Sequence, residues 1–289
     1  GPTERDAMFR EILRFEIAHH LNHRLFYCTA TVLFLFALGL MSSDLGVVFS
    51  HSPARVARNA PYVIVKLQAG LSSLGLFVIP AFVASSILRD FKHGTHPLFF
   101  SKPIRKFDYL LGRFSGSLLI SLALFVITAL GLLVGSIAPW QEAARVGPFL
   151  IAPYAVGLVL LVVPNLLVMG AIFFTVTSLS RSMLFTYVCV VVFICLQDYA
   201  EILAKELDSG FLGSLIEPLG ISALETASRY WTVTEYDTVL PGLSWPLLSN
   251  RLVWLALGGV TFIVGYSVFS YSRATARSWW SRRRRQAAS

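Results

Sequence analysis

Long apolar runs alternate with shorter polar stretches along nearly the whole chain. A bilayer core about 30 Å thick is crossed by roughly 20 apolar residues in a helix. Six segments come near that length: 25–41, 61–88, 109–136, 151–178, 184–199 and 251–271. The first and the fifth are short, so their ends would need flanking residues or a locally thinner bilayer. The pattern predicts an all-α integral membrane protein whose six-span transmembrane domain covers residues 25–271.

The residues before the first run, 1–24, have the spacing of an amphipathic helix. Its apolar positions are Phe9, Ile12, Leu13, Ile17 and Leu21, while Arg10, Glu11, Arg14 and His20 fall on other faces. Such a helix lies in the plane of the membrane interface. We expect it to rest on the cytoplasmic leaflet, where Arg14 and Arg24 would contact lipid phosphates.

The stretch 200–250 is too long for a simple connection and too polar to cross the membrane. Its helical periodicity is interrupted at Gly210, Gly213, Pro218 and Gly220. These breaks predict short helices that lie on the outer leaflet or re-enter it. We expect this segment to form a cap over the exit of a pathway.

Composition and charge support a membrane protein. Apolar residues make up 55% of the chain and charged residues 14%, and the mean hydropathy is +0.67. The formal charge of +8 would suit nucleic acid, but the basic residues gather beside apolar runs, where lipid headgroups and topology explain them better.

Basic residues also predict the orientation. With six spans both termini lie on one side, and 17 of the 24 Lys and Arg residues fall on that side, whereas acidic residues gather between Asp198 and Asp237 on the other. The positive-inside rule therefore predicts cytoplasmic termini, here in a bacterial inner membrane. The basic tail 272–289 would place Trp279 and Trp280 among lipid headgroups, although a solvated stop-transfer signal explains the tail nearly as well.

Motifs for metal binding and catalysis are missing from the sequence. His19 and His23 have the spacing of a two-histidine zinc site, but His20 stands where HExxH needs Glu, and we expect no metal. The three cysteines lie within apolar runs, where we expect packing roles. No GxxxxGK[ST] or GxSxG occurs, so we expect neither ATP hydrolysis nor another enzymatic activity in this chain.

Polar residues and prolines inside the apolar runs are candidates for a transport pathway. They are Lys66, Gln68, Pro80, Pro164 and Asn165. For Lys66 we favour an amine that reaches out to the surface, the alternatives being binding of an acidic group and a pair with an acid on the outer side. The prolines would kink their helices and either line a pathway or only pack.

Two further features concern helix contacts. Arg113, one turn into the third run, would pair with Asp90 or Asp108. The stretch GRFSG, with Gly112 and Gly116, has the GxxxG spacing that lets helices approach closely, and Gly70 and Gly75 would act similarly.

A polar island, "RDFKHGTHPLFFSKPIRK" at 89–106, separates the second and third runs. The predicted topology makes it a cytoplasmic loop that is too short for a domain and long enough for one helix across the membrane face. Side chains such as Lys92, His96, Phe99, Phe100 and Arg105 would dock into a soluble partner and turn its closure into movement of the spans.

The sequence "ILRDFKHGTHPLFFSKPIRKFDYLLGRF" around this island resembles the coupling stretch of ABC-type-2 exporter permeases. The resemblance covers nearly the whole chain and implies six spans and an ATPase-coupling loop at 89–108. It implies that Arg89, Asp90, Gly94, Thr95, Pro103 and Ile104 shape the loop, and that residues 108–114 start the third span. Together with the side chains above, the ATPase-coupling set is Arg89, Asp90, Lys92, His96, Phe99, Phe100 and Arg105. Lys92 and His93 depart from the family pattern, which is often acidic or small there.

Three other stretches, "NAPYVIVKLQAGLS", "SRYWTVTEYDT" and "NRLVWLALGG", resemble a subgroup whose longer members continue into a zinc aminopeptidase domain. This chain has no HExxH, so both a half-size permease and a fragment of a longer protein fit. The implied partners are two ABC ATPase subunits that bind ATP and Mg, a second six-span subunit, membrane lipids, and a zinc aminopeptidase in some settings.

The expected function is therefore export of an amphipathic, lipid-like or peptide substrate, driven by a separate ATPase. Two alternatives stay open. An ion-gradient transporter would need carboxylates inside the spans, and Asp198 is the only acid near one. A membrane scaffold would recruit a peptidase without moving any substrate.

Overall fold

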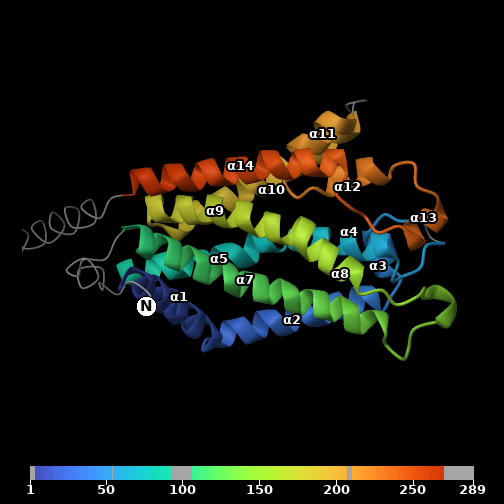
Figure 1. Cartoon of the computed structure of the whole chain (residues 1–289), viewed down its shortest axis with the longest axis horizontal. Helices are drawn as coiled ribbons and strands as arrows, with labels where there is room; N and C mark the ends of the chain where they lie inside the picture. The colour runs from blue at the N-terminus through green and yellow to red at the C-terminus, as the bar shows by residue number, and fades with distance from the viewer. Residues whose placement is uncertain (1–3, 54, 93–105, 207–209, 270–289) are drawn as a thin grey trace, which may run out of the picture.

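The computed structural model describes residues 4–53, 55–92, 106–206 and 210–269, with side chains left undescribed at a few helix ends. The described chain is an elongated bundle of helices (Figure 1). The predicted coupling residues His96, Phe99, Phe100 and Arg105, the side chains of Arg89, Asp90 and Lys92, and the tail residues Trp279 and Trp280 lie outside this description.

The helices, in order, are α1 (Glu4–Leu21), α2 (Arg24–Met41), α3 (Leu45–Phe49), α4 (Pro61–Ser72), α5 (Gly75–Lys92), α7 (Lys106–Ser136), a 3-10 turn (Ala143–Arg145), α8 (Ala152–Gly157), a π-helical turn (Leu158–Val162), α9 (Val163–Ser180), α10 (Met183–Glu206), α11 (Gly210–Ile216), α12 (Ile221–Ser228), α13 (Val233–Thr238) and α14 (Trp245–Val268). Five helical segments among the described residues are long and apolar enough to cross a membrane, and α4 with α5 makes a sixth if this bent pair is one span. The predicted all-α membrane fold is confirmed.

The second span is broken, at a place that the sequence did not indicate. Helices α4 and α5 meet at a 46° bend between Ser72 and Gly75, whereas Pro80, where we expected a kink, lies inside the continuous helix α5.

The fourth span has a π-helical turn directly before Pro164. A proline has no N–H to donate and clashes with the preceding turn, and the wider π-turn relieves both problems.

The last span begins earlier than the apolar run suggested. Helix α14 starts at Trp245, with Pro246 in its first turn, because a proline is well suited to a first turn whose N–H groups have no helical partner. The segment that we predicted as an outer cap, and call the cap below, therefore stops at residue 244, and Arg251 lies within the helix and not at its edge.

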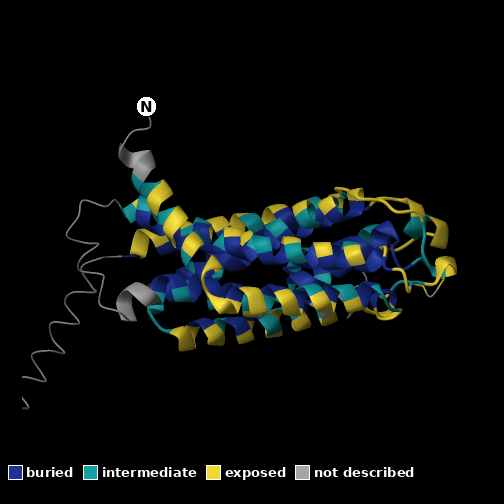
Figure 2. Ribbon diagram, turned by 90° about the horizontal axis from the view of Figure 1, so that it is seen from below, coloured by how far each residue is buried: buried dark blue, intermediate teal, exposed yellow. Residues whose placement is uncertain are grey.

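Helix α9 is the centre of the bundle and packs against α5, α7, α10 and α14. The largest core cluster is formed where these helices meet, around Phe125, Met169 and Phe173. Figure 2 shows buried residues along the axis and exposed residues on the outside. Many of the exposed residues on α2, α10 and α14 are apolar, as expected for surfaces that face lipid.

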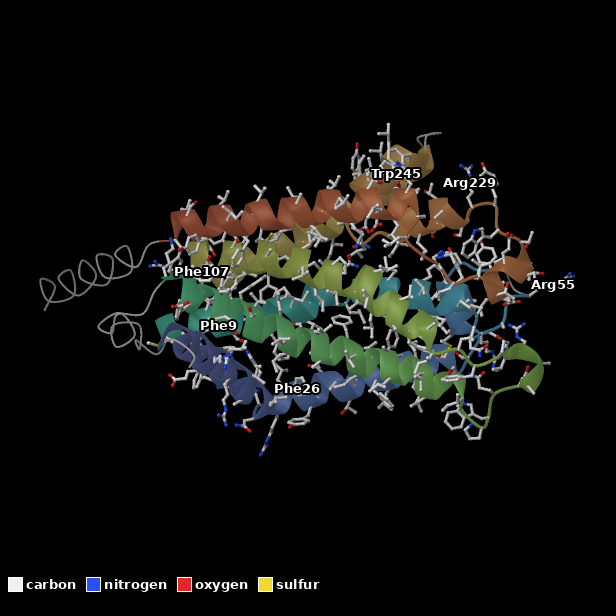
Figure 3. All side chains as sticks on the ribbon, in the orientation of Figure 1. Phe9, Phe26, Arg55, Phe107, Arg229 and Trp245 are labelled. Carbon is white, nitrogen blue, oxygen red and sulfur yellow. The ribbon has the colours of Figure 1, made fainter. Side chains whose placement is uncertain are left out.

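The two ends of the bundle differ. Helix α1, the start of α7 and the end of α14 lie at one end, while α3 and α13 lie at the other (Figure 1). Figure 3 places Phe9 and Phe107 at the first end and Arg55 and Arg229 at the opposite end. We call the opposite end the outer end, following the predicted orientation.

Polar contacts join the outer loops. Asp44 accepts hydrogen bonds from Arg58 at 2.9 Å and from Arg145 at 2.6 Å. These two guanidinium groups hold the pKa of Asp44 below its ordinary value, Arg58 having the larger effect. The loops after α2, before α4 and after α7 are thereby tied together.

Candidate functional site

Helix α1 docks directly onto the start of α7. A Cβ added to Gly112 would lie 2.8 Å from a methyl carbon of Ile12, and one added to Gly116 would lie 2.7 Å from the Cβ of Glu16. The two glycines therefore allow the helices to touch backbone to side chain. The GxxxG spacing does mark a close helix contact, and its partner is α1. Gly70, by contrast, has no neighbour within 4 Å of such an added atom.

This contact buries a cluster of four polar side chains. Glu16 of α1 has no exposed surface and accepts hydrogen bonds from Arg113 of α7 and Ser86 of α5. The Nε2 atom of His20 lies 3.0 Å from the Glu16 carboxylate and 3.1 Å from the Ser86 hydroxyl. We call Glu16, His20, Ser86 and Arg113 the α1 clamp. It joins α1 to the two helices that flank residues 93–105.

The clamp differs from the sequence-based expectation. The structure pairs Arg113 with Glu16, an acid that we did not single out. The side chain of the expected partner Asp90 lies outside the described residues, so that pair stays a prediction. His20, which we placed on the polar face of α1, is only 4% exposed and packs edge-on against Phe82, with ring centroids 5.3 Å apart. The signal was present in the sequence, because Glu16 and His20 are one helical turn apart.

A second buried network lies at the break in the second span. Asn165 of α9 donates to Ser72 Oγ at 2.7 Å and to the carbonyl oxygen of Leu219 at 3.1 Å, and it accepts a 2.6 Å hydrogen bond from Arg251. Asn165 thus connects the end of α4 to α14 and to the turn before α12. Asn165 is buried beside the π-helical turn of the fourth span, and its role in a pathway stays a prediction.

Arg251 fixes the turn between α11 and α12. It donates to the carbonyl oxygen of Pro218 at 3.1 Å and also to the side chain of Asn250. Asn250 in turn donates to the carbonyl oxygens of Ser214 at 2.6 Å and Glu217 at 2.7 Å. Sequence reasoning missed both residues because the last span was taken to begin at 251, at its outer edge.

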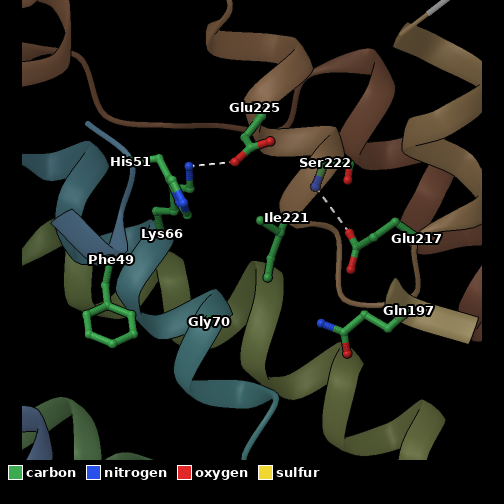
Figure 4. Close-up of a pocket in the computed structure, with 9 residues that line it drawn as sticks. All are labelled: Phe49, His51, Lys66, Gly70, Gln197, Glu217, Ile221, Ser222 and Glu225. Atoms are coloured by element: carbon green, nitrogen blue, oxygen red, sulfur yellow. Dashed lines mark hydrogen bonds and ion pairs between the residues drawn. The ribbon is translucent and has the colours of Figure 1, made fainter. Parts of the chain in front are cut away.

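A polar pocket of about 130 Å³ lies at the outer end, between α4, α10 and the cap (Figure 4). Lys66 of α4 is 5% exposed and forms a 2.6 Å ion pair with Glu225 of α12. The favoured interpretation, an amine reaching out to the surface, is therefore wrong, and the alternative pair with an outer acid is present. Gln68 is also buried, but it packs against α8 and donates to the carbonyl oxygen of Tyr154 at 3.2 Å.

The opposite wall of this pocket contains Glu217, which is 2% exposed. Burial raises its pKa above the ordinary value. Backbone N–H groups of Leu219 and Ser222, at 2.8 and 3.2 Å, act in the opposite direction because they stabilise the carboxylate.

The remaining predicted residues are less informative. Arg14 and Arg24 are exposed, and their contact with lipid phosphates stays a prediction. His19 and His23 lie with ring centroids 6.4 Å apart. Within the described ranges, no three His, Cys, Asp or Glu side chains come close enough together to hold a metal ion.

Comparison with known proteins identifies the family. A family model described as ABC-2 family transporter protein matches residues 10–224. No curated protein matched the chain. Members of this family are the membrane components of ABC transporters, which work with ATPase subunits. The match covers most of the chain, from α1 to α12, and the described helices fit it, so this protein belongs to the ABC-2 transporter family and is a membrane permease subunit.

Proposed function

We propose that this permease is the membrane half of an exporter that moves an amphipathic, lipid-like or peptide substrate outward. ATP and Mg bind to two ATPase subunits, and a second six-span subunit, identical or homologous, completes the pathway. The subunit sits in a bacterial inner membrane with both termini in the cytoplasm. The positive-inside distribution of Lys and Arg supports this orientation.

The observation that carries the proposal is the α1 clamp. Ser86 lies about two helical turns before the end of α5, and Arg113 about two turns after the start of α7. Both side chains contact Glu16. Movement of an ATPase subunit bound to residues 93–105 would therefore shift α1, α5 and α7 together as one rigid body.

Such rigid-body movement is how ATPase closure is converted into opening of a membrane pathway. The break between α4 and α5 supplies a bend at which the inner half of the second span can rotate against its outer half. The Asn165 network keeps the outer half attached to α9, α14 and the cap while this happens.

Affinity purification of the chain from its native membrane tests the proposal. The variant Asp90→Ala/Phe99→Ala/Arg105→Ala removes two charges and one aromatic ring from the predicted coupling loop. A matched control, Glu142→Ala/Arg229→Ala/Tyr230→Ala, removes one acid, one base and one aromatic ring at exposed positions of the outer end.

We expect an ATP-binding subunit to co-purify with the wild type and the control and to be lost from the loop variant. Native mass spectrometry of the same sample should show two six-span subunits for each pair of ATPases. A wild-type sample that carries a peptidase and no ATPase would favour a scaffold and overturn the exporter proposal.

A further inference from the structure

The outer pocket carries opposite charges on opposite walls. Lys66 and His51 lie on one side, Glu217 and Gln197 lie on the other, and Ile221 projects between them (Figure 4). Lys66 and Glu217 are both more than nine-tenths buried. A pocket with two such walls is suited to a ligand that is itself a dipole.

The counterion of Lys66 is exchangeable. The Lys66 side chain is 5% exposed, whereas the Glu225 side chain is 43% exposed. Breaking the ion pair costs the exposed carboxylate little free energy, because water solvates it. The buried ammonium has no such solvation and needs another charged partner. An acidic group that enters the pocket would therefore replace Glu225 on Lys66.

Glu217 has room for another donor. Its two carboxylate oxygens accept from the N–H groups of Leu219 and Ser222, and the Ile221 N–H and the charge of Arg251 also stabilise the carboxylate. An ionised carboxylate has about four acceptor positions. An ammonium group in the pocket would hydrogen-bond to a remaining position.

We propose that this pocket binds a small zwitterion, an ammonium group joined by a short linker to an acidic group. The acidic end pairs with Lys66 and the ammonium end with Glu217. A simple cation would contact only the Glu217 wall and leave the Lys66–Glu225 pair unchanged, and a simple anion at Lys66 would lie close to the Glu217 carboxylate, whereas a zwitterion pairs with both walls at once. The volume of about 130 Å³ exceeds that of a single water site several times over.

This inference rests on the proposed function, because such a zwitterion would be the head of the exported substrate. Two sources share the chemistry: the phosphoethanolamine headgroup of a lipid, and a short peptide with free termini. Both end at the outer leaflet or beyond it after transport, which is where the pocket lies.

Calorimetry on the purified full chain, together with any ATPase that it retains, tests the pocket directly. The probes are phosphoethanolamine and glycylglycine, with ethanolamine and inorganic phosphate as single-charge controls. We expect one or both zwitterions to bind at least about tenfold more tightly than either control, a difference of about 1.4 kcal/mol. Binding of phosphoethanolamine alone indicates a lipid substrate, and binding of glycylglycine alone indicates a peptide.

Two variants should act in opposite directions. Lys66→Met removes the partner of the acidic end and should abolish binding, whereas Glu225→Gln removes the internal competitor and should tighten it. Glu142→Gln, at an exposed outer acid away from the pocket, should change nothing. Equal affinity for zwitterions and single charges, or weaker binding by Glu225→Gln, overturns the proposal. Such a result with the ATPase still bound would leave the exporter function intact.

Discussion

Glu16 shows what single residues contribute to this permease. It is a fully buried carboxylate, and its charge is met by a buried arginine, a hydroxyl and an imidazole from three helices. Removing one member of a buried ion pair costs more than the pair itself contributes, because the other charge remains in a low-dielectric interior.

We therefore predict that Glu16→Gln destabilises the protein by about 3–5 kcal/mol, since the buried Arg113 would keep its charge and lose the Glu16 carboxylate. The measurement is unfolding of the purified chain by a detergent titration. Glu11→Gln removes an exposed acid from the same helix and should change stability by less than about 0.5 kcal/mol. A double variant, Glu16→Leu/Arg113→Leu, should recover part of the loss.

Gly220 is a second residue whose role follows from geometry. Its φ of 79° lies in the left-handed region, and an added Cβ would collide with the Arg251 guanidinium. Gly220→Ala should therefore lower stability by about 2 kcal/mol or more, from backbone strain and displacement of Arg251. Gly259→Ala, in α14 with open space around the added atom, is the control. Equal melting temperatures for the two variants would contradict this account.

At the scale of elements, α1 is held to α7 by glycine contacts as much as by charge. The variant Gly112→Ala/Gly116→Ala should push α1 away from α7, because each added Cβ would lie closer than 3.0 Å to α1. Trypsin should then cleave faster at the exposed residues Arg10 and Arg14. Gly39→Ala/Gly259→Ala makes the same change at open positions, and its digestion rate should match that of the wild type.

The outer loops give a prediction about pH. The folded pKa of Asp44 is lowered, so its pairing stabilises the protein above the ordinary value near 3.8 and is lost as the pH falls through the lowered value. Asp44→Asn should therefore melt below the wild type at neutral pH, and the two melting temperatures should begin to converge as the pH falls below the ordinary value near 3.8. Thermal melting followed by tryptophan fluorescence between pH 3 and 7 measures this. A difference in melting temperature that stays constant across the range would show that ionisation of Asp44 does not stabilise the protein.

The structure also shows how far sequence reasoning reached at this scale. The apolar runs predicted each span, and the Pro164–Asn165 pair pointed to an irregular fourth span, because both signals are local. The break at Ser72–Gly75 was not predicted, since no proline or charge marks it. The clamp was missed because its members come from three distant segments.

At the scale of the whole molecule, the main prediction is topology. The bundle has α1 at one end and Arg229 at the other (Figures 1 and 3), and the next residue, Tyr230, is exposed. In a cysteine-free background, we expect Tyr230→Cys to react with a membrane-impermeant maleimide on intact cells. Glu11→Cys should react only after the membrane is permeabilised. Reaction of Glu11→Cys on intact cells would reverse the orientation, and reaction of both from one side would refute the span count.

The sequence by itself determined the fold class, the approximate spans and the likeness to a permease family, and the family match and the helices confirm these. It also predicted an orientation, which stays a prediction. These properties depend on hydropathy, charge distribution and short motifs, all of which are written along the chain. Only the tertiary structure decided that Arg113 pairs with Glu16, that Lys66 pairs with Glu225, and that Arg251 holds the cap turn. A buried charge takes whichever partner the packing brings within hydrogen-bond distance, and helix packing joins residues that sequence spacing does not relate.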